Sequence, residues 1–383
     1  MMLLEDEIIQ FLKDNDIHYV LTLPCAKIKQ LLDKASRSFY HIPLSREEEG
    51  VGIATGLFLG GKRSAMLIQS GGIGNSLNAL LSLAQVYRIP IPIIISWRGI
   101  FEEKIEAQIP MGKYLPELFS ACELPFVEIH TKEDLPKIEK AIKDCFSLNL
   151  PYGIFISPEF WLQSKSSVDE PSDSKQLERK ITITYPKSET TLISPELTRF
   201  EALEALKSYL KDKFVLSNIG IPSKELYHLL DQPSNFYMLG SLGMVSAIGF
   251  GVALTTEAEI IVIDGDASFL MNPNIFGTIT SHQEDCRNLT ILLMDNGVCG
   301  STGNQQTASY KELDLEIIAN AFGMQKSTKA RTSSDIIASC KNLPFGPRLI
   351  HCIIKPGNKK EVTVIPLSAE DIKKRFMKSL QKS

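Results

Sequence analysis

Short, continuously apolar runs alternate with longer amphipathic segments along most of the chain, and this alternation restricts the fold more than any other feature. In the first half, the apolar runs are Tyr19–Leu23, Ala65–Gln69, Ile91–Ser96 and Gly153–Ser157. The amphipathic segments are Ile28–Ala35, Glu47–Leu59, Asn75–Val86 and Leu135–Phe146. Buried strands that alternate with helices are typical of a parallel sheet covered on both faces. The first half is therefore predicted to be a doubly wound α/β domain.

The alternation stops and then starts again. A polar, charged stretch at residues 164–193 reads as a linker. After it, strands are predicted at Phe214–Leu216, Ile260–Ile263, Leu289–Met294 and Leu349–Ile353, and helices at Glu196–Leu210, Leu313–Phe322 and Ser334–Asn342, the first of them capped by Ser194. The prediction is two α/β domains, residues 1–163 and 194–383, with no middle domain and no sequence repeat between them.

Composition excludes several classes of protein. The chain has 383 residues, 44% of them hydrophobic and 22% charged, as in a globular protein of about two domains. Its net charge is -4, and no basic run is interleaved with aromatic residues, which argues against nucleic acid as a partner. No signal peptide and no apolar run long enough to span a membrane are evident. The seven cysteines form no CxxC pair, so reduced thiols and a cytoplasmic location are expected.

Polar side chains follow two of the predicted strands in the second half. The first of these strands leads into Asp264-Gly265-Asp266-Ala267-Ser268, and the next leads into Asp295-Asn296-Gly297. The carboxyl edge of an open α/β sheet is where such folds bind ligands. Asp266, Asn296 and a backbone carbonyl shortly after it offer oxygen ligands of the kind that Mg²⁺ shares with phosphate. Gly265 allows a tight turn, and the amides of Ala267 and Ser268 can face an anion at a helix start.

This region resembles the signature of the thiamine-diphosphate enzymes, in which Gly-Asp-Gly is followed after just under thirty residues by Asn-Asn. The resemblance implies thiamine diphosphate and Mg²⁺ as cofactors, with Asp266 and Asn296 as side-chain ligands and the Val298 carbonyl as a third. The sequence departs from the signature at Ala267, which replaces the second Gly, and at Asp295, which replaces the first Asn. The spacing is also slightly long.

The same resemblance implies an acidic residue that activates the pyrimidine ring of the cofactor. In relatives this Glu lies nine positions before a Gly, and counting back from Gly56 gives Glu47, with Glu48 and Glu49 as competitors. Burial raises the pKa of such a carboxyl group. The small residues that follow permit the close approach of a ring or of another chain; they are Gly50, Gly52, Ala54 and Gly56.

Other segments complete the implied cofactor site. Tyr237–Gly243 resembles the segment that holds the cofactor bent, so Leu242 is expected to wedge between its rings and the Gly240 carbonyl to accept from its 4′-amino group. The glycine-rich stretch Ser70–Asn75, between a strand and a helix, is expected to contact an anion or a ring, with Ser70 and Gly71 as the candidate residues. In this family the pyrimidine domain of one chain faces the diphosphate domain of another, which implies at least a homodimer.

The pieces HIPLSREEEG, QSGGIGNSLNAL, ISWRG, TRFEALEAL and STGNQQT resemble the sulfopyruvate decarboxylases and the similar phosphonopyruvate decarboxylases. The sulfonate substrate is favoured, which implies formation of sulfoacetaldehyde and CO₂, a step of coenzyme M biosynthesis. The residues that could hold its terminal anion are Arg98, Lys113, Arg46, Asn75 and Gln108. The phosphonate substrate and a non-catalytic cofactor-binding protein are the alternatives. No residue is assigned as the acid that protonates the product.

Overall fold

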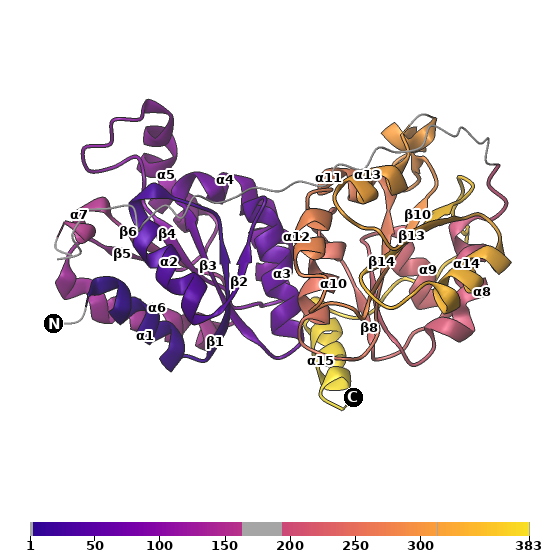
Figure 1. Ribbon diagram of the computed structural model, residues 1–383, viewed down its shortest axis with the longest axis horizontal. Helices are drawn as coiled ribbons and strands as arrows, with labels where there is room; N and C mark the ends of the chain where they lie inside the picture. Colours follow the sequence, from indigo (N-terminus) through magenta and orange to yellow (C-terminus); the bar gives the residue numbers. More distant parts are fainter. Residues whose placement is uncertain (1–2, 163–193, 312, 383) are drawn as a thin grey trace.

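The computed structural model describes residues 3–162, 194–311 and 313–382, which form two α/β domains side by side (Figure 1). The expected fold class is confirmed in both. The linker predicted at residues 164–193 lies outside the described residues. In the described part of the chain, no helix is both long and apolar enough to cross a membrane.

The first domain is built on a six-stranded parallel sheet in the order β2-β1-β3-β4-β6-β5. Its strands are β1 (Ile17–Thr22), β2 (Tyr40–Pro43), β3 (Arg63–Gln69), β4 (Pro92–Ser96), β5 (Phe126–Ile129) and β6 (Tyr152–Ile156). Its α-helices are α1 (Leu4–Asp14), α2 (Lys29–Ser38), α3 (Glu47–Leu59), α4 (Ser70–Ala79), α5 (Ile109–Ala121), α6 (Leu135–Leu148) and α7 (Pro158–Trp161), and a π-helical stretch, η2 (Leu80–Gln85), continues α4. Two apolar clusters, one on each face of the sheet, form its core.

The second domain contains a six-stranded sheet in the order β13-β14-β10-β9-β7-β8. Its strands are β7 (Phe214–Ser217), β8 (Asn235–Tyr237), β9 (Ile260–Gly265), β10 (Leu289–Asp295), β13 (Ser327–Ala330) and β14 (Arg348–Ile353), with a separate hairpin of β11 (Val298–Cys299) and β12 (Gln305–Gln306). Its helices are α8 (Arg199–Leu210), α9 (Ile221–Leu229), α10 (Val245–Ala253), α11 (Asp266–Met271), α12 (Ile275–Ser281), α13 (Leu315–Ala321), α14 (Ser333–Asn342) and α15 (Ala369–Leu380). Apart from the hairpin, its strands follow the same order along the chain as those of the first sheet, so the domains share a topology without a sequence repeat.

Six described strands were not predicted from the sequence: β11 and β12 of the hairpin, and the four edge strands of the two sheets, β2, β5, β8 and β13. Edge strands here are three or four residues long, and three of the four are only partly buried. They therefore lack the long apolar run that marks a central strand. The predicted start of α8 was also wrong, because its N-cap is Thr198, which forms a capping box with Glu201, and not Ser194.

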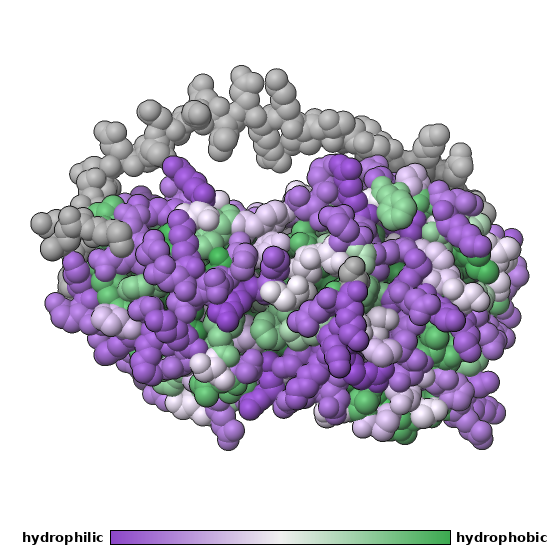
Figure 2. Space-filling model, turned by 90° about the horizontal axis from the view of Figure 1, so that it is seen from below, coloured by the Kyte–Doolittle hydropathy of each residue, from purple (hydrophilic) through white to green (hydrophobic). Residues whose placement is uncertain are grey.

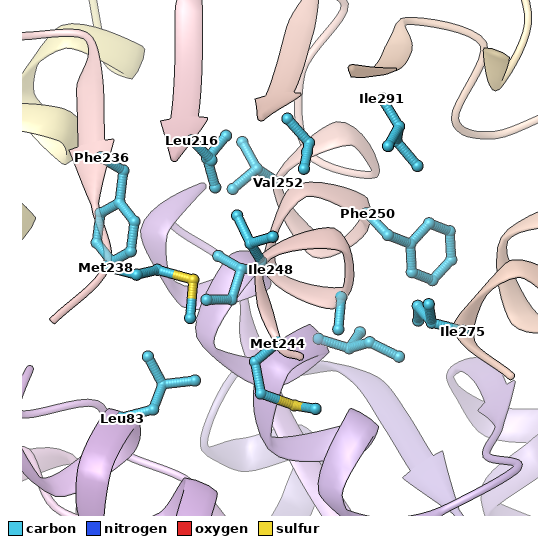
Figure 3. Packing of buried hydrophobic residues seen from close by; sticks show 14 of the residues in the cluster. Leu83, Leu216, Phe236, Met238, Met244, Ile248, Phe250, Val252, Ile275 and Ile291 are labelled. Atoms are coloured by element: carbon cyan, nitrogen blue, oxygen red, sulfur yellow. The ribbon is translucent and has the colours of Figure 1, made fainter. Parts of the chain in front are cut away.

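Helices α3 and α10 pack side by side where the two domains meet (Figure 1). They run parallel, because their contacts ascend together along the chain. A Cβ atom added at Gly52 would lie 2.7 Å from Ala247 Cβ, and one at Gly56 would lie 2.1 Å from the Ile248 carbonyl oxygen. These glycines were expected to admit a ring or another chain, but in the structure they admit α10 of the same chain. Figure 3 shows Ile248 of α10 between Leu216 of the second sheet and Leu83 of the first domain, with Met244, which directly precedes α10, nearby.

The parallel alignment of α3 and α10 fixes the relation between the two sheets. Each helix runs from the carboxyl edge of its sheet back to the amino edge, because it connects two parallel strands. Both carboxyl edges therefore lie on the same side of the molecule. The opposite side, seen in Figure 2, is largely hydrophilic, with apolar side chains scattered among polar ones.

Candidate active site

Two adjacent strands of the second sheet bring Asp266 and Asn296 together. Met294 of β10 pairs with Gly265 of β9, so the residues that follow each strand emerge side by side. Asp266 is the first residue of α11 and is 3% exposed, and Asn296 directly follows β10 and is 6% exposed. Burial raises the pKa of the Asp266 carboxyl group, while Thr307 opposes that shift by donating a hydrogen bond to it.

A cavity of about 100 Å³ opens at this edge. It is lined by the residues expected to hold the diphosphate and the metal, namely Gly265, Asp266, Ala267, Ser268, Asn296 and Val298, and by Leu242, which was expected to wedge between the cofactor rings. Every residue that lines it belongs to the second domain. The diphosphate and metal candidates are thus gathered at one place, and Gly240 lies in the adjoining segment.

Asp295 replaces the expected Asn and has a partner that suits a carboxylate. His351 Nε2 lies 2.9 Å from Asp295 Oδ2, and both residues are buried. Ser309 Oγ donates to Asp295 Oδ1 over 2.8 Å and lies 3.3 Å from Asp266 Oδ2, so one hydroxyl joins the two carboxylates. The Gly297 amide also donates to Asp295. Asp295, which departs from the signature, therefore has a hydrogen-bond network of its own.

In the first domain, Glu47 begins α3 at the carboxyl edge of the sheet. It is 3% exposed, and its Oε2 accepts a hydrogen bond of 3.0 Å from Asn75 Nδ2 on α4. A Cβ atom at Gly72 would lie 2.5 Å from Glu47 Oε1, so a glycine is needed where this carboxylate packs. Ser70–Asn75 belongs to α4 and is not a loop between strand and helix. Its first turn therefore faces the carboxylate directly.

The other two glutamates of the cluster have different partners. Glu48 pairs with Arg46 at 3.3 Å. Glu49 is fully buried between the domains, where it accepts hydrogen bonds from Asn274 and Thr278 of α12. Burial raises the pKa of Glu49. Glu47 differs from both in its partners, because it contacts Asn75 and Gly72 of α4.

Residues of the first domain brace the segment Tyr237–Gly243. The Tyr87 hydroxyl donates to the Tyr237 carbonyl over 2.6 Å and accepts from the Leu239 amide. Ser82 Oγ lies 2.6 Å from Ser241 Oγ, and a Cβ atom at Gly240 would lie 2.5 Å from the Ser82 carbonyl oxygen. The segment that carries Leu242 is consequently fixed in position before any ligand binds.

Comparisons with known proteins agree with this geometry. Residues 2–115 match the N-terminal TPP binding domain of the thiamine pyrophosphate enzymes, and residues 218–352 match their C-terminal TPP binding domain. The chain belongs to the thiamine pyrophosphate enzymes. The second match contains Asp266 and Asn296, and the first contains Glu47.

Relatives that match nearly the whole chain are named as two kinds of decarboxylase. The chain is 41% identical to a sulfopyruvate decarboxylase of Methanosarcina acetivorans, over 98% of this chain and 97% of that protein. It is 31% identical to a phosphonopyruvate decarboxylase of Streptomyces hygroscopicus, over 93% of this chain and 89% of that one. Shorter relatives match part of the chain, such as sulfopyruvate decarboxylase subunit beta of Methanothermobacter thermautotrophicus (41% identity, 48% of this chain and 96% of that one).

Solved structures support the fold. The benzoylformate decarboxylase of Polynucleobacter necessarius superposes with a TM-score of 0.70 over 94% of this chain and 100% of that one, at 15% identity. The superposition thus includes both domains of this chain. At this level of identity the match concerns architecture alone.

The residues at the cavity fit the metal–diphosphate part of the thiamine pyrophosphate cofactor. The available ligands are a carboxylate, a carboxamide and a backbone carbonyl, which are the hard oxygen donors that Mg²⁺ prefers. Among the described residues, no group of three or more His, Cys, Asp and Glu side chains is placed to hold a metal. A metal bound here would therefore need further oxygens, such as those of a diphosphate.

The candidates for the substrate's terminal anion fall into two groups. The two neutral candidates, Asn75 and Gln108, lie near the carboxyl edge of the first sheet: Asn75 is beside Glu47, and Gln108 Oε1 is 3.8 Å from where a Cβ atom of Gly71 would be. The cations are engaged elsewhere. Arg98 forms a bidentate ion pair with Glu103, which lowers the pKa of that carboxyl group to about 2. Arg46 pairs with Glu48, and Lys113 lies 5.1 Å from the Tyr114 ring centroid.

Sequence reasoning missed five polar residues of the second domain. Thr307 and Ser309 contact Asp266, while Arg199, Asn218 and Asn358 line the cavity. Asn218 follows β7 as Asn296 follows β10, so a polar residue after a strand was a signal available in the sequence. Asn358 comes from the segment after β14 and carries no local pattern.

Proposed function

We propose that the protein decarboxylates 3-sulfopyruvate to sulfoacetaldehyde and CO₂ with thiamine diphosphate and Mg²⁺. The main support for this substrate is the 41% identity, over nearly the full length of both chains, to the sulfopyruvate decarboxylase of Methanosarcina acetivorans. Glu47, Asp266 and Asn296 at the carboxyl edges support the reaction class. A degenerate, non-catalytic homologue would not need all three.

In this proposal each residue of the chain has one task. Asp266, Asn296 and the Val298 carbonyl hold Mg²⁺, and the amides of Ala267 and Ser268 donate to the diphosphate. Glu47 holds a proton at N1′ of the pyrimidine ring, and Asn75 orients its carboxyl group. When bound, thiamine diphosphate supplies a nucleophilic carbon and then accepts the electron pair released with CO₂.

The substrate carries two anionic groups, and only one leaves. The carboxylate is lost as CO₂, which a poorly solvated site favours. The sulfonate must be held throughout, and Asn75, Gln108 and the Gly71 amide are the neutral donors nearest to Glu47. Arg98 binds Glu103 through Nε and Nη2, so this ion pair would compete with a sulfonate for the guanidinium.

We infer that the working unit is at least a homodimer. The cavity that contains Asp266 is lined only by the second domain, whereas the activating acid lies on the first. Large apolar side chains are exposed beside both carboxyl edges, among them Ile105 and Phe101 in the first domain and Leu239 and Met271 in the second. A second chain that docked there would cover them and complete the site.

Mixing two inactive variants tests this arrangement. Glu47→Gln and Asp266→Ala chains, unfolded together and refolded, should regain about a quarter of wild-type activity, because half of the dimers would carry one intact site between chains. If each chain assembled its own site, no activity would return. Each variant refolded alone is the control.

Phosphonopyruvate is the second candidate substrate, because relatives that are 31–32% identical over 93% of this chain are phosphonopyruvate decarboxylases. The function is tested by adding sulfopyruvate to protein freed of cofactor and metal, with thiamine diphosphate and Mg²⁺ restored singly and together. CO₂ and aldehyde should form only with both. Release of CO₂ without thiamine diphosphate would overturn the proposal.

A further inference from the structure

Arg199 is the one basic residue among those that line the cavity with Asp266 and Asn296. It is the first residue of α8, directly after the capping residue Thr198, and it is 7% exposed. The acidic side chains on this cavity are Asp264 and Asp266. A bound diphosphate would add further negative charge, and a positively charged side chain at this position would attract it.

Two partners hold the Arg199 guanidinium in one orientation. Its Nε donates to Glu225 Oε2 over 2.7 Å, and its Nη2 donates to Asn358 Oδ1 over 2.9 Å. Glu225 is completely buried and also accepts from the Lys359 amide. Asn358 in turn donates to the Gly300 carbonyl, which also lines the cavity. These protein contacts therefore fix the orientation of the guanidinium.

One side of this guanidinium has no protein partner. Within the described residues, no hydrogen bond uses Nη1 of Arg199. Arg348, a second buried arginine of the same domain, differs in this respect. Its Nε donates to Thr290, its Nη1 to the Leu343 carbonyl, and its Nη2 to Tyr209 and Glu259. Arg348 thus engages all three of its nitrogens, whereas Nη1 of Arg199 is available to a ligand at the cavity.

A buried Arg–Glu pair is costly to desolvate and adds little stability by itself. It is better suited to presenting donors in a fixed direction, because the planar guanidinium binds phosphate oxygens with defined geometry. In a cavity of about 100 Å³, an anion held at Asp266 and Asn296 through a metal cannot lie far from Arg199.

We propose that Arg199 binds the terminal phosphate of thiamine diphosphate, with Glu225 and Asn358 as the positioning residues that aim its Nη1 into the cavity. The proposal rests on the cofactor site described above. The substrate's terminal sulfonate is the other oxyanion that could meet this group, and the experiment distinguishes the two.

Calorimetric titration of the cofactor-free protein with thiamine diphosphate and with thiamine monophosphate, both with Mg²⁺, isolates the terminal phosphate. The variant is Arg199→Gln/Glu225→Gln, which leaves no unpaired buried charge. The matched control is Arg348→Gln/Glu259→Gln, which removes the ion pair between buried Arg348 and partly buried Glu259, neither of which lines this cavity. Arg199→Lys is measured in addition, because it keeps the charge beside Glu225 and therefore the fold.

The wild type should bind the diphosphate more tightly than the monophosphate. In Arg199→Gln/Glu225→Gln this preference should fall by about tenfold or more, since a hydrogen bond to a charged group is lost. Arg199→Lys should fall in between, and the Arg348 control should keep the wild-type preference. An unchanged preference, or equal weakening of both ligands, would refute the proposal.

If the preference is unchanged while KM for sulfopyruvate rises, Arg199 serves the substrate and the proposal is wrong. If the wild type itself binds no thiamine diphosphate, both this proposal and the proposed cofactor site are wrong. Each result is separate from a failure of the decarboxylation assay, because the titration needs no substrate.

Discussion

Three consecutive glutamates at the start of α3 have different surroundings because their side chains point in different directions. In the sequence they are equivalent candidates, and the count back from Gly56 selected Glu47 only through the resemblance. The structure separates them by partner: Glu47 faces Asn75 and Gly72, Glu48 pairs with Arg46, and Glu49 enters the domain interface. Successive helical positions point 100° apart, so one acidic run supplies three different environments.

Replacing Glu47 by Gln tests its assigned role. Turnover should fall at least about a hundredfold, since a proton-holding group is lost, while thiamine diphosphate still binds. Turnover and calorimetric cofactor affinity are measured together. Glu48→Gln and Glu49→Gln are the matched controls, and normal turnover in Glu47→Gln would transfer the role to one of them.

The pair of His351 and Asp295 could not be foreseen, because the two residues lie 56 positions apart and meet only through the pairing of β14 with β10. We expect His351→Leu to weaken the joint binding of Mg²⁺ and thiamine diphosphate about 10- to 100-fold, as the loss of a group that orients a ligand loop does. His351→Gln, which can still donate to Asp295, should retain most of the affinity. Equal losses in the two variants would argue against this orienting role.

At the scale of elements, the central strands and the helices between them could be predicted, because their apolar runs are long. The edge strands could not, since they are short and partly exposed. The sequence showed the small residues of α3 but not their role, because it does not indicate which surface packs against them. Gly52 and Gly56 meet α10 of the same chain, whereas Gly50 meets Leu44 and Met66 of its own domain.

This difference gives a paired test on one helix. A Cβ atom at Gly56 would lie 2.1 Å from the backbone carbonyl oxygen of Ile248, whereas at Gly50 it would meet the ends of the Leu44 and Met66 side chains. Gly56→Ala should lower the free energy of unfolding by about 2 kcal/mol or more, and Gly50→Ala by clearly less, because flexible side chains can move. Chemical denaturation of both variants measures this, and equal effects would contradict the assigned contact.

The domain interface should also respond to pH through Glu49. Burial raises its pKa in the folded state, so its contribution to stability is complete below the unfolded pKa of about 4.3 and is lost as pH rises through the folded pKa. Relative to Glu49→Gln, the wild type should therefore lose unfolding free energy as pH rises above about 4.3 and through the raised folded pKa of Glu49. A difference between the two proteins that does not vary with pH would rule this out.

For the whole molecule, the sequence was sufficient to predict two α/β domains and the cofactor family. It did not predict that the two sheets share one strand order, or that parallel packing of α3 and α10 turns both carboxyl edges to the same side. Those features depend on contacts between segments about 200 residues apart. The site accordingly divides: Glu47 is on one domain, and the cavity with Asp266, Asn296 and Arg199 is on the other.

The most direct test of the central claim is a comparison of kcat/KM for 3-sulfopyruvate and 3-phosphonopyruvate, measured side by side with saturating thiamine diphosphate and Mg²⁺. The account predicts that sulfopyruvate is preferred by about tenfold or more, which requires about 1.4 kcal/mol of selective transition-state binding. Equal or greater efficiency with phosphonopyruvate, or turnover of neither substrate, would contradict it.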